Sequence, residues 1–146
     1  MKTPTTRFGL VDVDDLTLLT FPAGIIGFPA STRFVILDQG NAPCQWLQSV
    51  EEPDLAFVII DPVVLKPDYR IEVPVEDIPE LAVENGGDLT VFVFLTIPPD
   101  DPESITANLR GPIVVNQRTR LAKQVIVDDD LPTQYPIFTN YFSLSR

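Results

Sequence analysis

The stretch Leu89-Thr90-Val91-Phe92-Val93-Phe94-Leu95-Thr96-Ile97 carries the strongest fold signal in the sequence. It is rich in β-branched and aromatic residues, which favour strands. Successive side chains of a strand point to opposite faces, so the valines and Leu95 would lie on one face and the two phenylalanines on the other. A strand that is apolar on both faces is typical of the centre of a sheet, or of a sheet covered by the rest of the chain. We therefore expect a central strand here.

Proline divides the remaining chain into short segments. The 15 prolines among 146 residues are about twice the usual ~5%, and they stand between apolar runs rather than in one cluster. Because proline cannot donate to a helix or to a sheet ladder, each one ends a segment. Six further segments are rich in β-forming residues: 16–21, 33–37, 45–50, 56–60, 112–116 and 124–127. Short strands at this spacing predict an all-β, antiparallel, barrel-like fold.

Helix is scarce in the sequence. Residues 75–83 alone have a helical pattern, and Pro79 lies inside it, so we expect at most one short helix. Residues 84–88 contain Asn-Gly and Gly-Gly and predict a loop. We expect a single domain over residues 1–138 and a tail over residues 139–146 that is either flexible or packed as an extra strand.

The composition argues against catalysis. The chain has no histidine, the commonest general base and metal ligand. Its one cysteine, Cys44, cannot form an internal disulfide or a cysteine-built zinc site, and we interpret it as a buried hydrophobic residue. We therefore predict a protein that is not an enzyme and that has no cofactor and no metal.

The charge points to protein partners. The net charge of −11, from 21 acidic and 10 basic residues, repels nucleic acid and anionic lipid and steers basic proteins toward the chain. Acidity can equally serve only solubility, and the composition does not decide between the two. No apolar run has the length of a membrane helix or of a secretion signal. We expect a cytoplasmic, protein-binding chain that is monomeric when free and binds neither nucleic acid nor membrane.

The clustered charges have simple interpretations. The acidic pairs at residues 14–15, 51–52 and 100–101 and the triple at 128–130 stand beside turn formers or proline, so we interpret them as solvated turn residues and not as a glycosidase pair or a calcium loop. The basic residues Arg118, Arg120 and Lys123 are interpreted as a strand edge protected by charge rather than as a nucleic-acid groove.

Acidic residues and prolines bracket the apolar run of residues 56–60 at both ends, and Lys66-Pro67-Asp68-Tyr69 follows. Proline restrains the loop, so acidic and aromatic side chains are presented at low entropic cost to a partner. Such a loop suits a basic or mixed protein surface, although ordinary turn chemistry also explains it.

Six motifs resemble the family of the bacterial flagellar assembly factor FliW. They are TFPAGIIGF at residues 20–28, WLQSVEEPDLAF at 46–57, DP and PDY at 61–62 and 67–69, TANLRGPIVVN at 106–116 and KQVI at 123–126. The resemblance runs in order from about Thr6 to Phe138. It implies an antiparallel β-barrel-like fold without enzymatic activity.

The resemblance also implies two partners. One is flagellin, held in the cytoplasm before export. The other is the basic, RNA-binding carbon storage regulator CsrA, which represses flagellin translation until FliW, released from flagellin, binds it by an allosteric, non-competitive route. The chain departs from the family pattern at residues 134–137 and at Ala122. A rival interpretation is a small acidic β-barrel that serves as an interaction module or chaperone for another basic partner.

The expected partner contacts are matched positions that we expect to be exposed. They are Glu51, Glu52, Asp54, Asp61, Asp68, Tyr69, Asn108 and Asn116. Each has a rival structural role: the aspartates at 54 and 61 as turn caps, the asparagines as partners of backbone groups at strand ends, and the tyrosine as a core residue.

Overall fold

The computed structural model describes residues 1–40, 42–82, 88–127 and 130–137. Residues 84–87 of the expected loop, Asp128 and Asp129 of the acidic triple, and the expected tail at 139–146 lie outside the described residues.

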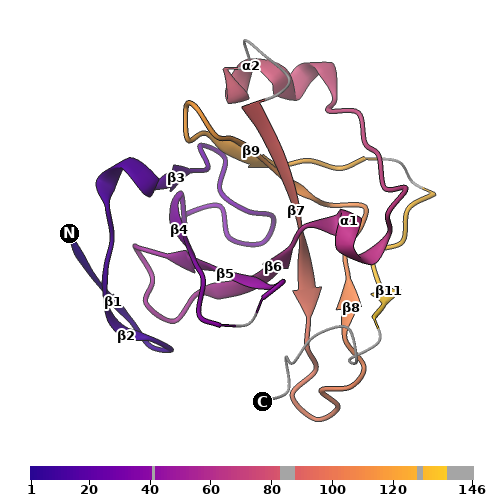
Figure 1. Cartoon of the computed structure of the whole chain (residues 1–146). Helices are drawn as coiled ribbons and strands as arrows, with labels where there is room; N and C mark the ends of the chain where they lie inside the picture. Colours follow the sequence, from indigo (N-terminus) through magenta and orange to yellow (C-terminus); the bar gives the residue numbers. More distant parts are fainter. Residues whose placement is uncertain (41, 83–87, 128–129, 138–146) are drawn as a thin grey trace.

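Strands dominate the described part of the chain (Figure 1). They are β1 (Lys2–Thr5), β2 (Gly9–Asp12), β3 (Leu19–Thr20), β4 (Arg33–Leu37), β5 (Gln45–Ser49), β6 (Ala56–Ile60), β7 (Leu89–Thr96), β8 (Thr106–Ala107), β9 (Ile113–Asn116), β10 (Ala122–Gln124) and β11 (Tyr135–Pro136). Helical turns are η1 (Asp15–Thr17), α1 (Pro62–Leu65), η2 (Val75–Asp77) and α2 (Ile78–Leu81). The predicted all-β class is confirmed.

The main sheet is antiparallel and curls toward a barrel. Its strand order is β10-β9-β7-β6-β5-β4-β3, with β8 paired to β7 and β11 paired to β8, while β1 and β2 form a separate hairpin. The two ends of this path meet where the Thr20 N–H donates to the Arg120 carbonyl at 2.9 Å, beside a single parallel bridge from Thr20 to Leu121. One bridge is not a ladder, so the sheet is barrel-like without being a closed barrel.

Strand β7 is central, as the sequence predicted. One edge pairs with β6; the other pairs with β9 along the first half of the strand and with β8 at its end. Its alternate residues separate as expected: Phe92 and Phe94 belong to one hydrophobic cluster, and Val93 and Leu95 to another. Both faces of β7 are therefore covered by the chain.

The first of these clusters, which we call the inner cluster, takes one side chain or more from almost every strand of the path. Its buried members are Leu19, Phe21, Ile25, Phe34, Leu47, Ile59, Phe92, Ile113, Val115 and Ala122. Burial of one large side chain contributes about 1.5–3 kcal/mol. The inner cluster thus joins strands that are distant in sequence.

Two short α-helices are described where the sequence predicted at most one. Helix α2 lies in the expected region, with Pro79 in its first turn, where a missing N–H costs nothing. Helix α1 is the additional one: the Asp61 carboxylate accepts from the Val63 N–H at 3.0 Å and caps it, and Pro62 occupies its first turn. The Asp-Pro pair ends strand β6, but it also starts a helix, because both residues favour helix N-termini.

The basic residues near β10 bind neighbouring segments rather than only protecting an edge. Lys123 pairs with Asp77 at 2.6 Å and with Glu80, and these contacts join α2 to β10. Arg120 donates to the Thr17 carbonyl at 2.9 Å. These contacts attach α2 and η1 to the end of the sheet, a role that the local sequence did not indicate.

The environment of the cysteine and the possible membrane and metal sites can be described next to the sheet. Cys44 is buried, as predicted, and burial raises the pKa of its thiol to about 11. Within the described ranges, no helix is both long and apolar enough to cross a membrane, and no cluster of three or more His, Cys, Asp or Glu side chains is arranged to hold a metal ion.

The connection between β3 and β4 contains a tight turn. The Phe28 N–H donates to the Ile25 carbonyl at 2.6 Å, and the reverse bond is 3.3 Å. Gly24 has a φ of +70° and Gly27 a φ of +90°, values that only glycine adopts readily. A Cβ at Gly24 would lie 2.6 Å from the Pro29 Cα, whereas a Cβ at Gly27 would meet nothing within 4 Å.

The two glycines allow backbone strain and steric conflict to be separated. Gly27→Ala should lower the free energy of unfolding by about 1–2 kcal/mol, the cost of a left-handed residue that has a Cβ. Gly24→Ala should lower it by clearly more, because the backbone at Pro29 must also move. Urea unfolding of both variants measures the difference, and equal losses would contradict the close packing of Gly24.

Candidate functional site

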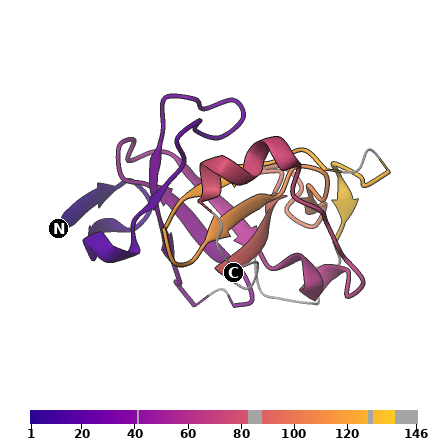
Figure 2. The same ribbon diagram turned by 90° about the horizontal axis from the view of Figure 1, so that it is seen from above.

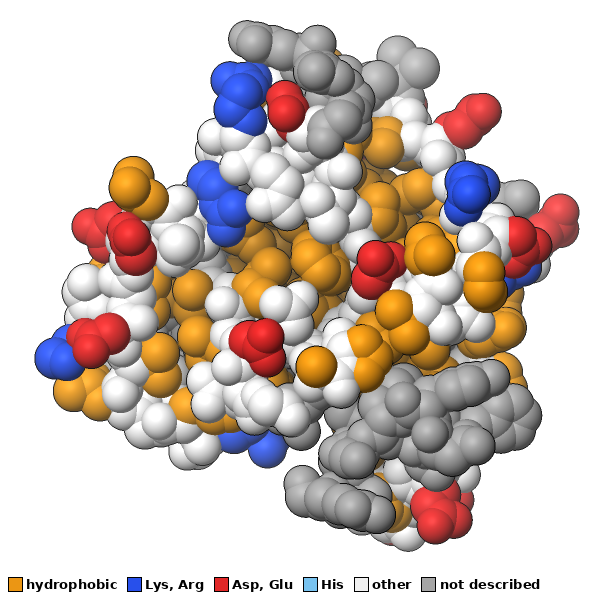
Figure 3. Space-filling model, in the orientation of Figure 1, with side chains coloured by type: hydrophobic (Ala, Val, Ile, Leu, Met, Phe, Trp, Pro, Cys, Tyr) orange, Lys and Arg blue, Asp and Glu red, His pale blue; other side chains and the backbone are white. Residues whose placement is uncertain are grey.

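A groove beside α1 is lined by two of the predicted contact residues, Asp61 and Tyr69. Its volume is about 380 Å³. Its lining residues come from α1, the segment after it and the start of β7: Asp61, Pro62, Val63, Tyr69, Arg70, Ile71, Leu89, Thr90 and Val91. In Figure 3 hydrophobic side chains gather between α2 and α1, where this surface lies. We call it the α1 groove.

Helix α1 presents two valines to solvent, and one of them, Val63, lines the groove. Val63 is 46% exposed and Val64 is 47% exposed. The Asp61 cap and Pro62 define where the helix starts. At its end the Lys66 N–H donates to the Pro62 carbonyl at 2.9 Å. The two apolar side chains are thus held on an ordered turn, which reduces the entropy lost when a partner covers them.

The rim of the α1 groove carries both signs of charge. Asp61 and Arg70 are exposed, and Arg70 donates to the Tyr69 carbonyl at 2.7 Å. Asp68 pairs with Lys66 at 2.8 Å, and this hydrogen bond lowers the pKa of the Asp68 carboxyl. Asp68 is exposed and Lys66 is half-buried, and a pair of this kind at the surface contributes little to stability.

Tyr69 does not have the exposure that the sequence analysis expected. Its side chain is buried, and its hydroxyl donates to the Leu109 carbonyl at 2.7 Å. Burial raises the pKa of its phenol to about 12. The rival role as a core residue therefore describes Tyr69 better, because an aromatic ring with a satisfied hydroxyl is stable inside the fold.

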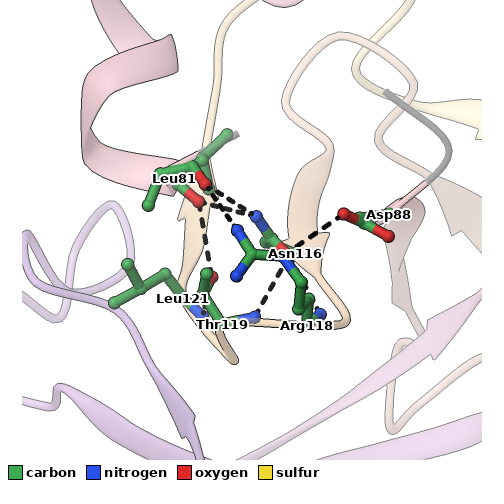
Figure 4. A network of polar contacts seen from close by, with 7 residues as sticks. Leu81, Asp88, Asn116, Arg118, Thr119 and Leu121 are labelled. Atoms are coloured by element: carbon green, nitrogen blue, oxygen red, sulfur yellow. Dashed lines mark hydrogen bonds and ion pairs between the residues drawn. The ribbon is translucent and has the colours of Figure 1, made fainter. Parts of the chain in front are cut away.

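Asn116 is fully buried, so its expected exposure is also wrong. Its amide nitrogen donates to the Leu81 carbonyl at 2.8 Å and to the Ala82 carbonyl at 3.4 Å, where α2 ends. Its amide oxygen accepts from the backbone N–H groups of Arg118 at 2.9 Å and Thr119 at 3.2 Å. Figure 4 shows this side chain between the end of α2 and the turn that follows β9.

The Arg118 side chain adds to this network. Its Nε lies 3.5 Å from an Asp88 carboxylate oxygen, and its Nη2 donates to the Ala82 carbonyl at 3.3 Å. Asn108 has a local role of the same kind, since its amide oxygen accepts from the N–H groups of Arg110 at 3.1 Å and Gly111 at 2.9 Å. Both asparagines satisfy backbone groups, as their rival interpretation stated.

The three acidic positions at 51–54 lie together on the turn between β5 and β6. The Glu51 carboxylate accepts from the N–H groups of Thr32 at 2.7 Å and Arg33 at 3.0 Å, and these bonds lower the pKa of Glu51. Glu52 accepts from the Ser31 hydroxyl, and Asp54 from that of Thr6. All three acidic residues are exposed, as expected.

The structure therefore divides the expected contact residues into separate places. Asp61 and the buried Tyr69 line the α1 groove, and Asp68 precedes Tyr69 in the sequence. The acids of the β5–β6 turn lie elsewhere, and the two asparagines satisfy backbone groups. The sequence analysis missed the two exposed valines of α1. Residues 62–65 were not recognised as a helix, because four residues are too few to show a helical periodicity.

Comparison with known proteins gives consistent results. The sequence model of the family described as "FliW protein" matches residues 2–137. A flagellar assembly factor FliW of Natranaerobius thermophilus is 34% identical over 148 residues, which cover 100% of this chain and 98% of the relative. One of Geobacter sulfurreducens is 39% identical over 140 residues, 94% of this chain and 87% of the relative.

A solved structure is similar over nearly the same extent. It is described as the crystal structure of the flagellar assembly factor FliW, and it superposes with a TM-score of 0.87 at 34% identity. The superposition covers 94% of this chain and 97% of the other.

Removal of the Asn116 side chain should be costly. Asn116→Ala leaves buried carbonyl and N–H groups without partners, each at a cost of roughly 1–3 kcal/mol, so the free energy of unfolding should fall by at least about 2 kcal/mol. Asn108→Ala is the matched control, and since its site is only half-buried it should cost less. Urea unfolding compares the two, and an equal or smaller loss for Asn116→Ala would contradict its central role.

The Glu51 carboxylate should stabilise the fold in a pH-dependent way. Its pKa is lowered from 4.5 in the folded state, so its contribution is present above about pH 4.5 and is lost as the pH falls through the lower, folded-state pKa. Glu51→Gln should therefore be less stable than the parent at pH 7, and the gap should shrink toward pH 3. Chemical unfolding at both pH values measures it, with Glu103→Gln on an exposed turn as control. A difference in unfolding free energy between the parent and Glu51→Gln that does not change with pH would refute this role of the Glu51 carboxylate.

Proposed function

The chain belongs to the FliW family, whose relatives are named flagellar assembly factors, and on that premise we propose that it is a cytoplasmic partner switch. In this role it holds flagellin before export, and when flagellin leaves, it binds the translational regulator CsrA and relieves the repression of flagellin synthesis. The role is non-enzymatic. It is supported by the names of the relatives and by a sequence without histidine.

The α1 groove is the observation that carries the proposal at the level of residues. It combines the exposed apolar side chain of Val63 with the exposed carboxylate of Asp61, and its residues Asp61 and Tyr69 belong to stretches that match the family motifs. An apolar side chain of a partner would enter the groove, and a basic side chain beside it would meet a carboxylate of the rim. Apolar anchors with a polar rim are the usual composition of a protein interface.

The charge of the chain favours a basic partner at the α1 groove. With a net charge of −11, the protein attracts a cationic protein over distances of about a Debye length, ~8–10 Å at physiological salt. Attraction of this kind raises the association rate more than the affinity. We therefore assign CsrA, the basic member of the proposed pair, to this groove.

A partner switch also needs coupling between its two ligands. Binding of flagellin must lower the affinity for CsrA, and thermodynamic linkage requires the same factor in reverse. Allosteric coupling typically amounts to ~1–3 kcal/mol. The alternative role, an interaction module or chaperone for a different basic partner, would use the same groove without this coupling, and titration in the presence of flagellin distinguishes the two.

The groove assignment can be tested with purified partners. Val63→Asp should weaken CsrA binding about tenfold or more, because a buried valine contributes about 1.5 kcal/mol or more, and association with the parent should slow as salt rises. Leu10→Asp in β2, another exposed apolar position at 64%, is the matched control and should bind as the parent does. Surface-based kinetics measures both. Unchanged binding by Val63→Asp, with its fold intact by circular dichroism, would exclude the groove; no binding of either partner to the parent protein would end the proposed function.

A further inference from the structure

A second exposed apolar surface lies on the connection between β3 and β4, away from the α1 groove. In Figure 2 this connection projects from one side of the molecule, while α1 lies toward the opposite side. Ile26, in the middle of the tight turn, is 62% exposed. An isoleucine is an unusual choice at the tip of a turn, where glycine, asparagine and other polar residues dominate.

The turn that carries Ile26 is ordered on both sides. Its two backbone hydrogen bonds join Ile25 and Phe28, and the Ile26 N–H donates to the Gln124 amide oxygen at 3.0 Å, across 98 residues of sequence. Ile25 itself is buried in the inner cluster. The exposed side chain is therefore presented from a backbone tied down by local and distant contacts, which lowers the entropy lost on binding.

Two more exposed apolar residues belong to the same region: one in the same turn as Ile26, and one two residues beyond Gln124, the hydrogen-bond partner of Ile26. Phe28 is 41% exposed and packs edge-on against Phe57, with ring centroids 5.5 Å apart. Ile126 is 54% exposed and follows Gln124 by two residues in extended backbone, where alternate side chains share a face. The backbone bonds of Val125 to Pro112 and of Val127 to Arg110 keep this stretch extended. We call Ile26, Phe28 and Ile126 the turn surface.

Carboxylates border the turn surface. The Ser31 N–H donates to the Phe28 carbonyl at 3.3 Å, and the Ser31 hydroxyl donates to Glu52. The Glu51 carboxylate accepts from the N–H groups of the two residues that follow Ser31, Thr32 and Arg33. Both glutamates are exposed, and the positive charge of the exposed Arg33 offsets one of their two negative charges. The border is thus acidic beside an apolar centre.

We propose that the turn surface is a second docking site, and that its occupant is an amphipathic segment with an apolar face flanked by Lys or Arg. The apolar face would cover Ile26 and Phe28, and the basic side chains would reach Glu51 and Glu52. A second copy of this chain fits poorly, because each copy brings a net charge of −11 and the same acidic border. The inference stands on this surface alone and does not depend on the proposed function.

A designed peptide tests the chemistry of the occupant. The probe is an 18-residue fluorescein-labelled helix with leucines on one face and lysines beside them, and its counterpart has glutamate at every lysine position. The parent protein should bind the lysine peptide, and Ile26→Asp should bind it at least tenfold more weakly in fluorescence anisotropy. Leu16→Asp, at an 81% exposed position of η1, and Val63→Asp in the α1 groove should each change affinity less than twofold.

Three results would overturn the inference: binding unaffected by Ile26→Asp, binding weakened equally by the control variants, or equal affinity for the glutamate peptide. The double variant Glu51→Gln/Glu52→Gln should weaken binding and reduce its dependence on salt. Sedimentation of the parent and of Ile26→Asp adds one outcome, since a dimer lost on substitution would show that a second copy is the occupant and would refute the proposed partner chemistry.

The same variants separate this inference from the proposed function. If neither flagellin nor CsrA binds the parent protein while the peptide results hold, the proposed function fails and the docking surface stands. If both partners bind the parent protein and Ile26→Asp leaves the affinity for the peptide unchanged, only the docking surface is refuted. Thermal unfolding of Ile26→Asp should match the parent, because the side chain is mostly in solvent.

Discussion

Burial of β7 on both faces is the constraint on which the rest of the structure depends. Its phenylalanines belong to the inner cluster, while Val93 and Leu95 pack with a second cluster that includes Tyr69 and Ile105. A strand with no solvated face needs cover from segments distant in sequence. That cover comes from the curled sheet on one side, and on the other from the segments after β6 and β7.

The two candidate docking surfaces follow from the same alternation. Val91, on the face of β7 opposite the inner cluster, lines the α1 groove. Phe94, on the face toward the inner cluster, meets Phe57 with ring centroids 5.0 Å apart, and Phe57 supports Phe28 of the turn surface. Surfaces built on opposite sides of one strand need not overlap.

Polar groups in this fold mainly hold connections in place. Asn116, Lys123 and Glu51 each tie a connection or short helix to the sheet. Apart from the eight-residue β7, the described strands have two to five residues and the two α-helices have four. Elements this short make few internal hydrogen bonds, so side chains must satisfy the backbone groups at their ends. This explains why several acidic and amide residues inside the family motifs contribute to architecture before they contribute to any interface.

The sequence by itself determined the strand-rich class, the central position of β7, the alternation of its faces and the burial of Cys44, because these follow from local periodicity and from the chemistry of single residues. It did not decide that Tyr69 and Asn116 are buried, that Lys123 bridges to α2, or that Val63, Val64 and Ile26 remain in solvent. Exposure depends on which distant segments come to cover a side chain. In a chain of short strands joined by proline-rich connections, only the tertiary arrangement settles that cover.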